Sequence, residues 1–214
     1  RVRKVVVFNY GMGNIKSDMR AVEQTGSTAI LSRGPDDIRN ADRVILPGVG
    51  AFETGMNELR QRSLDVALTD FIHTGRPLLG ICLGMQMLLD DSEEHGKHIG
   101  LGFIPGSVVQ IPSGDNGALT RKIPHIGWSA LHVSSKQKQW ANSALDTTKE
   151  GDYFYFVHSF MASLKDDAHV LAECEYEGLA IPAVLKKDNI TACQFHPEKS
   201  GPSGLDILNR FTNS

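Results

Sequence analysis

Hydrophobic and polar residues follow two alternating patterns along residues 1–90. Short apolar runs bounded by turn residues predict strands, and stretches with apolar residues at helical spacing predict helices between them. Such alternation of strand and helix is typical of an α/β protein with a doubly wound, mostly parallel sheet. The expected strands cover residues 4–8, 28–31, 43–46 and 78–81, and the expected helices cover 15–25, 54–60 and 64–73.

The second half of the chain changes to strands separated by turn signals, which predicts an antiparallel extension of the sheet. A polar stretch at 134–151 predicts a surface connection, and 202–212 predicts a closing helix. No repeat, low-complexity tract or linker divides the chain, so we expect one domain over 1–214. The additional strands are expected at 126–133, 153–158, 170–176, 183–187 and 190–195.

The strand expected at 78–81 leads directly into a cysteine between two glycines, in the sequence GICLG at 80–84. The pattern from 83 to 90 then predicts a helix. A strand that turns into a helix within two residues needs glycines where side chains would collide. This is the pattern of a nucleophile elbow with Cys82 at its apex, where the helix start favours a thiolate. A buried structural cysteine fits the local pattern equally well.

A cysteine nucleophile needs a base, and the base needs an orienting group. Of the eight histidines, His196 stands in the phrase that offers both, QFHPEK at 194–199. In an extended segment His196 and Glu198 would project to the same side, and the carboxylate would hold the imidazole tautomer. A surface turn with a solvated glutamate is the alternative for this phrase alone, and an independent elbow cysteine counts against it.

Composition narrows the possible partners. The 214 residues carry a formal net charge of −3 and 22% charged residues, so no broad basic surface for nucleic acid is expected. No apolar stretch approaches the ~18 residues of a membrane span, and no secretory signal is visible. Three cysteines, an odd and small number, favour a reducing compartment, and we expect a cytoplasmic protein.

Two alternative sites have weaker support. Gly11 and Gly13 fit the start of a dinucleotide fingerprint, but Lys16 stands where its third glycine would fall, and a tight turn is the simpler interpretation. Cys193 and His196 are three residues apart but would face opposite sides of a strand. We therefore expect no metal site.

Six phrases together resemble a known family. The elbow GICLGMQ at 80–86, PGVG at 47–50 and HPEK at 196–199 resemble the class I (triad) glutamine amidotransferases. Three further phrases resemble the glutaminase subunits of imidazole glycerol phosphate synthases within that family. They are NYGMGN at 9–14, PHIGW at 124–128 and YFVHS at 155–159.

The resemblance implies a flavodoxin-like sheet and hydrolysis of glutamine to glutamate and ammonia without a cofactor. Cys82 would attack the carboxamide, His196 would transfer protons, and Glu198 would orient the imidazole. The N–H groups of Leu83 and Val49 would stabilise the oxyanion. The strand around Val49 would rest in a non-productive orientation, so we expect little activity without a partner.

The resemblance also implies substrate contacts and a partner. Gly50, Gln86, Glu94, His158 and Ser159 would bind glutamine, although a solvated acidic turn explains Glu94, and ordinary strand positions explain His158 and Ser159, equally well. The ammonia would pass to a cyclase of (β/α)₈-barrel type in histidine biosynthesis, with no nucleic acid or membrane involved. The residues expected at or near this contact are Asn14, Pro124, Trp128, Tyr155 and Lys199.

Some departures and alternatives stay open. Ser129 stands where the family usually has Asn, and Phe160 where it often has Tyr, so details of the interface can differ. A paralogous amidotransferase that supplies ammonia to another acceptor is the enzymatic alternative. A degenerate, non-catalytic regulatory relative is the second, and it would be expected to have lost part of the Cys82, His196 and Glu198 set.

Overall fold

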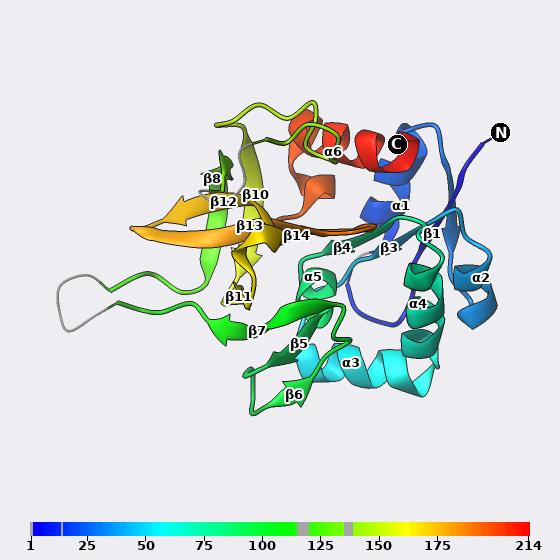
Figure 1. The fold of residues 1–214 in the computed structure, drawn as a ribbon, viewed down its shortest axis with the longest axis horizontal. Helices are drawn as coiled ribbons and strands as arrows, with labels where there is room; N and C mark the ends of the chain where they lie inside the picture. Colours follow the sequence, from blue (N-terminus) through cyan, green and yellow to red (C-terminus); the bar gives the residue numbers. More distant parts are fainter. Residues whose placement is uncertain (1, 14, 115–119, 135–138) are drawn as a thin grey trace.

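The computed structural model describes residues 2–13, 15–114, 120–134 and 139–214. In this part of the chain an eight-stranded sheet forms the centre of the molecule (Figure 1). Its first five strands run parallel and its last three are antiparallel, as the sequence predicted. In spatial order they are β2 (Thr28–Leu31), β1 (Lys4–Val7), β3 (Arg43–Leu46), β4 (Leu78–Ile81), β14 (Ile190–Cys193), β13 (Leu179–Lys187), β12 (Val170–Tyr176) and β9 (His132–Val133).

Helices cover both faces of the parallel part of the sheet (Figure 1). One face carries α1 (Ile15–Gln24) and α6 (Gly201–Asn213), and the other carries α3 (Phe52–Gln61) and α4 (Leu64–His73). Alternate side chains of β1 therefore enter two separate cores, Val5 and Val7 on the first face and Val6 on the second. Burial on both faces explains why these strands read as continuous apolar runs.

Two smaller sheets extend the second half of the chain. One pairs β8 (His125–Ala130) with β10 (Tyr153–His158) in antiparallel register. The other lies beside α5 (Leu83–Met87) and has the order β11-β7-β5-β6. Its strands are β11 (Phe160–Leu164), β7 (Ile104–Gln110), β5 (Leu89–Ser92) and β6 (His98–Ile99).

The helix expected across 83–90 is wrong in length, because α5 ends at Met87. The segment 100–104 explains the early end. Leu101 N–H donates to the Met87 carbonyl, and Phe103 N–H donates to the Leu88 carbonyl. Backbone carbonyls that a longer helix would use are thus taken by a neighbouring chain segment, and residues 89–92 continue as β5.

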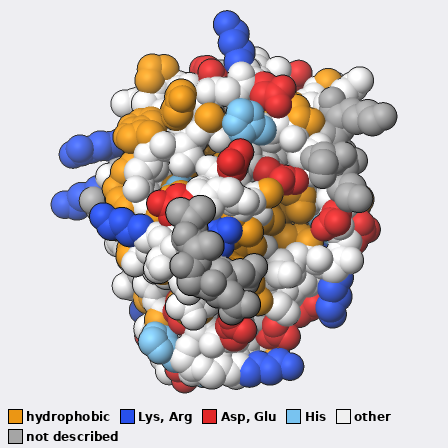
Figure 2. Space-filling model, turned by 90° about the vertical axis from the view of Figure 1, so that its left-hand side faces the viewer, with side chains coloured by type: hydrophobic (Ala, Val, Ile, Leu, Met, Phe, Trp, Pro, Cys, Tyr) orange, Lys and Arg blue, Asp and Glu red, His pale blue; other side chains and the backbone are white. Residues whose placement is uncertain are grey.

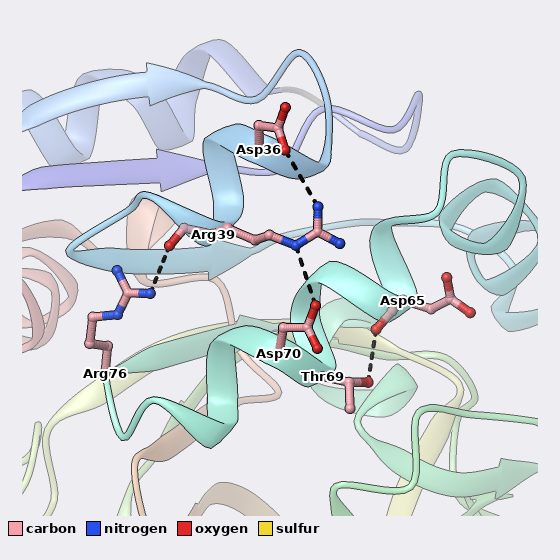
Figure 3. Close-up of polar contacts among 6 residues, drawn as sticks. All are labelled: Asp36, Arg39, Asp65, Thr69, Asp70 and Arg76. Atoms are coloured by element: carbon pink, nitrogen blue, oxygen red, sulfur yellow. Dashed lines mark hydrogen bonds and ion pairs between the residues drawn. The ribbon is translucent and has the colours of Figure 1, made fainter.

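A short helix that the sequence analysis missed, α2 (Pro35–Arg39), packs beside α4. Figure 3 shows the side chain of Arg39, the last residue of α2, reaching towards α4. It donates to Asp70 of α4 at 3.3 Å and to Asp36 of α2 at 3.4 Å. Arg76, just before β4, donates to the Arg39 carbonyl at 2.7 Å. These contacts are exposed, so they orient α2 more than they stabilise it.

The remaining connections complete the fold. The stretch predicted at 134–151 contains no helix or strand in its described residues, and 135–138 lie outside them. Trp140 donates to the Leu171 carbonyl at 3.0 Å and fixes this connection against β12. None of the helices in the described residues is long and apolar enough to cross a membrane.

Candidate active site

The nucleophile elbow predicted around Cys82 is present in the structure. Cys82 joins β4 to α5 with φ 54° and ψ −112°, a backbone conformation that residues other than glycine rarely adopt. A Cβ on Gly84 would lie 1.8 Å from the Leu46 carbonyl oxygen, so only glycine fits there. Backbone N–H of Cys82 donates to the Cys193 carbonyl at 2.8 Å. The strained turn is therefore anchored to β14, the strand that leads to His196.

The His196 imidazole is held by Glu198, as predicted. His196 Nδ1 and Glu198 Oε1 are 2.7 Å apart, and both side chains are almost fully buried. The segment is not extended throughout, because Pro197–Lys199 forms a 3₁₀ turn, η2. The short turn still brings the carboxylate back to the ring. The other ring nitrogen, Nε2, makes no hydrogen bond with any described residue, so it is available to the neighbouring thiol.

The electrostatics of this group favour a protonated imidazole. Burial alone would lower the pKa of His196, but interactions with Cys82 and Glu198 outweigh burial and raise that pKa to about 10. His196 therefore carries the proton at neutral pH. A proton on His196 beside the sulfur is the condition for a thiolate–imidazolium pair.

The predicted oxyanion donors are in a closed arrangement. Leu83 N–H donates to the Gly48 carbonyl oxygen at 3.1 Å, so it has no free direction for a substrate oxyanion. Gly48 and Gly50 on either side of Val49 have φ 149° and 117°. The hydroxyl of Tyr10, which is buried, donates to the Pro47 carbonyl at 2.5 Å and lies against Gly48. This segment, residues 47–50, is named the oxyanion strand after its predicted role, and its Gly48 carbonyl occupies one of the two predicted donors.

A cleft of about 370 Å³ opens beside the sulfur. This volume suits a ligand of amino-acid size. It brings together residues from α5, β10, β11, the turn between β4 and α5, and the loops after β3, after β5 and before β8. Nine of the residues named from the sequence line it, together with Val157 and Phe160. These nine are Val49, Gly50, Cys82, Leu83, Gln86, Glu94, Pro124, His158 and Ser159.

Two of the predicted substrate contacts already have protein partners. Both N–H groups of the Gln86 amide are used, by the Phe160 carbonyl at 3.1 Å and by Gln194 Oε1 at 3.2 Å. Gln86 can therefore offer only its Oε1 to a ligand. Glu94 accepts from the Phe52 N–H at 3.0 Å, at the start of α3, through one of its two oxygens. Its other oxygen remains able to accept from an ammonium group.

His158 is fixed as a neutral ring by its neighbours. Its Nδ1 donates to the Phe160 carbonyl at 2.9 Å, because a carbonyl can only accept. In a neutral ring Nε2 then accepts from His125 Nδ1 at 2.9 Å, and in a neutral His125 Nε2 accepts from the Ser129 hydroxyl at 2.9 Å. Burial lowers the pKa of both histidines to about 4, in agreement with neutral rings.

A second cavity of about 80 Å³ lies against His196, Glu198 and the oxyanion strand. Asp18 of α1 lines it, with a side chain that is 8% exposed and an Oδ1 without a hydrogen-bond partner among the described residues. Glu198 also lines it, and its Oε2 is likewise unpartnered there. Burial and the negative charge of Glu198 raise the pKa of Asp18 to about 8, while His196 and Lys199 oppose that rise.

The structure adds residues that the sequence analysis did not assign. Gln194 donates through Nε2 to Cys82 Sγ at 3.9 Å, and it stood unassigned inside the QFHPEK phrase. Asp18 could have been noticed, because it shares a helical face with buried Ala21 and Val22. Tyr10 and His125 carried no comparable signal, since their roles depend on segments far away in the sequence.

The residues expected at the partner contact differ in their exposure to solvent. Trp128 is 54% exposed, and its ring lies 6.0 Å from that of the opposite Tyr155 on β10. Lys199 is exposed, and Pro124 lines the cleft rather than standing apart from it. Asn14 lies outside the described residues.

Comparison with known proteins decides the family. The model of the family "Glutamine amidotransferase class-I" matches residues 6–213. The chain belongs to this family. Among solved structures, PurLQS from Thermotoga maritima superposes on this amidotransferase with a TM-score of 0.71 at 18% identity, covering 100% of this chain and 99% of the other. That likeness supports the class I fold, which the sequence predicted.

Two curated relatives are much more similar in sequence. Imidazole glycerol phosphate synthase subunit HisH 1 from Legionella pneumophila (strain Lens) is 45% identical over 207 residues, which is 97% of each chain. Imidazole glycerol phosphate synthase subunit HisH from Bacillus subtilis (strain 168) is 41% identical over 206 residues, covering 96% of this chain and 94% of that protein. The similarity extends over nearly the full length of both relatives.

Proposed function

We propose that this amidotransferase is the glutaminase subunit of an imidazole glycerol phosphate synthase, with residues 1–214 acting as one domain. It hydrolyses glutamine to glutamate and ammonia. The ammonia passes to a (β/α)₈-barrel cyclase that makes imidazole glycerol phosphate and AICAR in histidine biosynthesis. The observation that carries this proposal is the 45% identity over 97% of both chains to a HisH subunit.

The chemistry follows from the arrangement of Cys82, His196 and Glu198. The Cys82 thiolate attacks the carboxamide carbon of glutamine and forms a tetrahedral intermediate. His196, which holds a proton at neutral pH, donates it to the amide nitrogen, and the C–N bond breaks to release that nitrogen as ammonia. The imidazole then accepts a proton from the water that hydrolyses the glutamyl thioester. Glu198 keeps the imidazole in one tautomer through both steps.

The oxyanion strand provides the control. While the Gly48 carbonyl accepts from Leu83 N–H, the tetrahedral oxyanion lacks this donor. Rotation of the peptide between Gly48 and Val49 would remove the carbonyl and bring Val49 N–H towards the same position. One movement would therefore supply two donors, and each such donor contributes about 3 kcal/mol to lowering the barrier. Partner binding is the signal that we propose for this rotation.

An exposed apolar face suits the docking of the cyclase. Ile126, Trp128 and Tyr153 are each more than half exposed on the paired strands β8 and β10. They lie next to the cleft, because β10 also contributes His158 to its lining. Figure 2 views the molecule from the end that carries β7, β8 and β12 in Figure 1, and hydrophobic side chains are exposed there among charged side chains of both signs. Such a patch next to an ammonia-releasing site would shield the product from water.

We also propose a cytoplasmic location. All three cysteines are free and buried in the described structure. Free thiols are kept reduced in the cytosol, which suits an enzyme with a thiolate nucleophile.

Reconstitution with a barrel cyclase tests the proposal. With glutamine as nitrogen source, the cyclase should form imidazole glycerol phosphate only when this chain is added. With ammonium salts the chain should be unnecessary. A Trp128→Asp variant should lose the glutamine-dependent reaction, because a charge replaces exposed apolar area, and should leave the ammonium-dependent reaction unchanged. Failure of the wild-type chain to support glutamine use, or its co-purification with a different synthase, would contradict the acceptor assignment.

A further inference from the structure

Gln194 is a buried side chain in direct contact with the Cys82 sulfur. It follows β14 and is 0% exposed, with its backbone N–H bonded to the Ala183 carbonyl at 2.9 Å. Its Nε2 lies 3.9 Å from Cys82 Sγ as a hydrogen-bond donor. The reaction steps carried out by Cys82, His196 and Glu198 do not involve this amide. A buried polar group facing a reactive sulfur calls for an account of its orientation and its effect.

The orientation of the Gln194 amide follows from one backbone carbonyl. The Phe160 carbonyl can only accept, so the amide nitrogen of Gln86 must face it, at 3.1 Å. The second N–H of Gln86 then donates to Gln194 Oε1 at 3.2 Å. Because this contact uses the oxygen of Gln194, its nitrogen must face Cys82. A turned Gln194 amide would place two N–H₂ groups against each other.

The same carbonyl is fully occupied from its other side. His158 Nδ1 donates to it at 2.9 Å, so both lone pairs of the Phe160 oxygen have donors. His158 in turn accepts from His125, and His125 accepts from the Ser129 hydroxyl. With both histidines neutral, every link of this network has a single allowed direction. The Gln194 N–H is therefore fixed towards the sulfur by groups on α5, β8, β10 and β11.

We propose that Gln194 is a further residue of the nucleophile site, whose amide N–H stabilises the Cys82 thiolate in an orientation set through Gln86 by the Phe160 carbonyl. The thiol form has a different partner, because Cys82 Sγ can donate to the Val157 carbonyl at 4.0 Å. A thiolate has no proton to donate to that carbonyl. It can accept a hydrogen bond from the Gln194 N–H, and such a bond is stronger to a charged acceptor than to a neutral one. Gln194 thus favours the charged form. This inference rests on the proposed role of Cys82.

The test is the pH dependence of alkylation at Cys82 in the full chain. The rate of modification by iodoacetamide is followed on the Cys82 peptide by mass spectrometry, which separates it from buried Cys174 and Cys193. Gln194→Met keeps the approximate length of the side chain and removes the donor. We expect the midpoint of its alkylation profile to move up by about one pH unit. Gln24→Met, at an exposed position of α1, should leave the midpoint unchanged.

A second measurement does not depend on a folded Gln194→Met variant. In the ¹⁵N-labelled wild-type chain, the Gln194 side-chain amide resonance should shift with the same midpoint as Cys82 alkylation. The resonance is assigned by its loss in Gln194→Glu. An unchanged midpoint in Gln194→Met, or an amide resonance that does not respond to pH, would overturn the inference. If Cys82→Ala retained glutaminase activity, the proposed nucleophile role of Cys82 would fail instead, whatever the alkylation profile showed. If the wild-type chain with its cyclase released no ammonia from glutamine, the proposed function would fail.

Discussion

Asp18 lowers the stability of the folded protein at neutral pH, because it is buried beside the charged Glu198 of the active site. It lies beside Glu198 on a small cavity, with one oxygen unpartnered among the described residues. Burial and the Glu198 charge raise its pKa from 3.8 to about 8. The folded protein therefore holds a proton on Asp18 at pH values where the unfolded chain has released it. By linkage, this group makes the folded state less stable as pH rises from about 4 to about 8.

Asp18→Asn should remove this pH-dependent loss of stability, because asparagine does not ionise. The difference in unfolding free energy between variant and wild type should be small near pH 4. It should grow to roughly 5 kcal/mol in favour of the variant near pH 8, since the pKa of Asp18 rises from 3.8 to about 8 and each pKa unit corresponds to about 1.4 kcal/mol. Urea unfolding of both proteins at several pH values measures this difference in unfolding free energy. Asp206→Asn, at an exposed position of α6, is the control, and a gain that stayed constant with pH would contradict this explanation.

At the residue scale, the sequence was most informative where chemistry depends on a short local phrase. Cys82 between glycines and His196 two residues before Glu198 were both predicted. In the structure Glu198 contacts His196, and Cys82 interacts with the same imidazole. Gln194 was missed because its burial is set by the fold and leaves no local pattern. Asp18 was missed although it shares a helical face with the buried Ala21 and Val22. Their catalytic and electrostatic roles remain predictions for the experiments above.

The oxyanion strand is the element that we propose controls the reaction. Its resting state is stabilised by two hydrogen bonds, from Leu83 N–H to the Gly48 carbonyl and from the Tyr10 hydroxyl to the Pro47 carbonyl. Burial raises the pKa of Tyr10 above its usual value, so the hydroxyl stays a donor. A Cβ on Gly48 would lie 2.1 Å from that hydroxyl, which shows how closely the tyrosine packs on the strand.

Tyr10→Phe should weaken the closed state and raise the glutaminase rate of the chain without its partner. The loss of one neutral hydrogen bond, about 1 kcal/mol, predicts an increase of roughly fivefold. Ammonia release by the isolated chain measures it. Tyr153→Phe removes a hydroxyl from an exposed tyrosine and should leave this basal rate unchanged. A basal rate in Tyr10→Phe at or below that of the wild type would argue against control by this strand.

Elements were predicted well where burial imposed a regular pattern. The strands at 28–31, 43–46 and 78–81 were located to the residue, and so was the helix at 64–73. The strand β7 was missed because Pro105 and Gly106 interrupt its pattern. The elbow helix was made too long, since the carbonyls at its end are bound by a segment more than ten residues away. Such tertiary hydrogen bonds leave no local periodicity to detect.

At the scale of the whole molecule, the site lies where the two halves of the chain meet. The parallel half supplies Cys82 and the oxyanion strand, and β14 inserts beside β4 to bring His196 from the other half. The β8–β10 pair then adds one wall of the cleft and an exposed apolar face. The sequence predicted the mixed sheet. The separate small sheets could not be predicted, because strand pairing between distant segments is set by packing.

Trapping the reaction intermediate tests the central claim most directly. The partner-bound chain is mixed with glutamine, quenched with acid during turnover and digested for mass spectrometry. Our account predicts a glutamyl thioester on the peptide that contains Cys82, and no ammonia release by the Cys82→Ala complex. A Cys82→Ala complex that releases ammonia at the wild-type rate would contradict it.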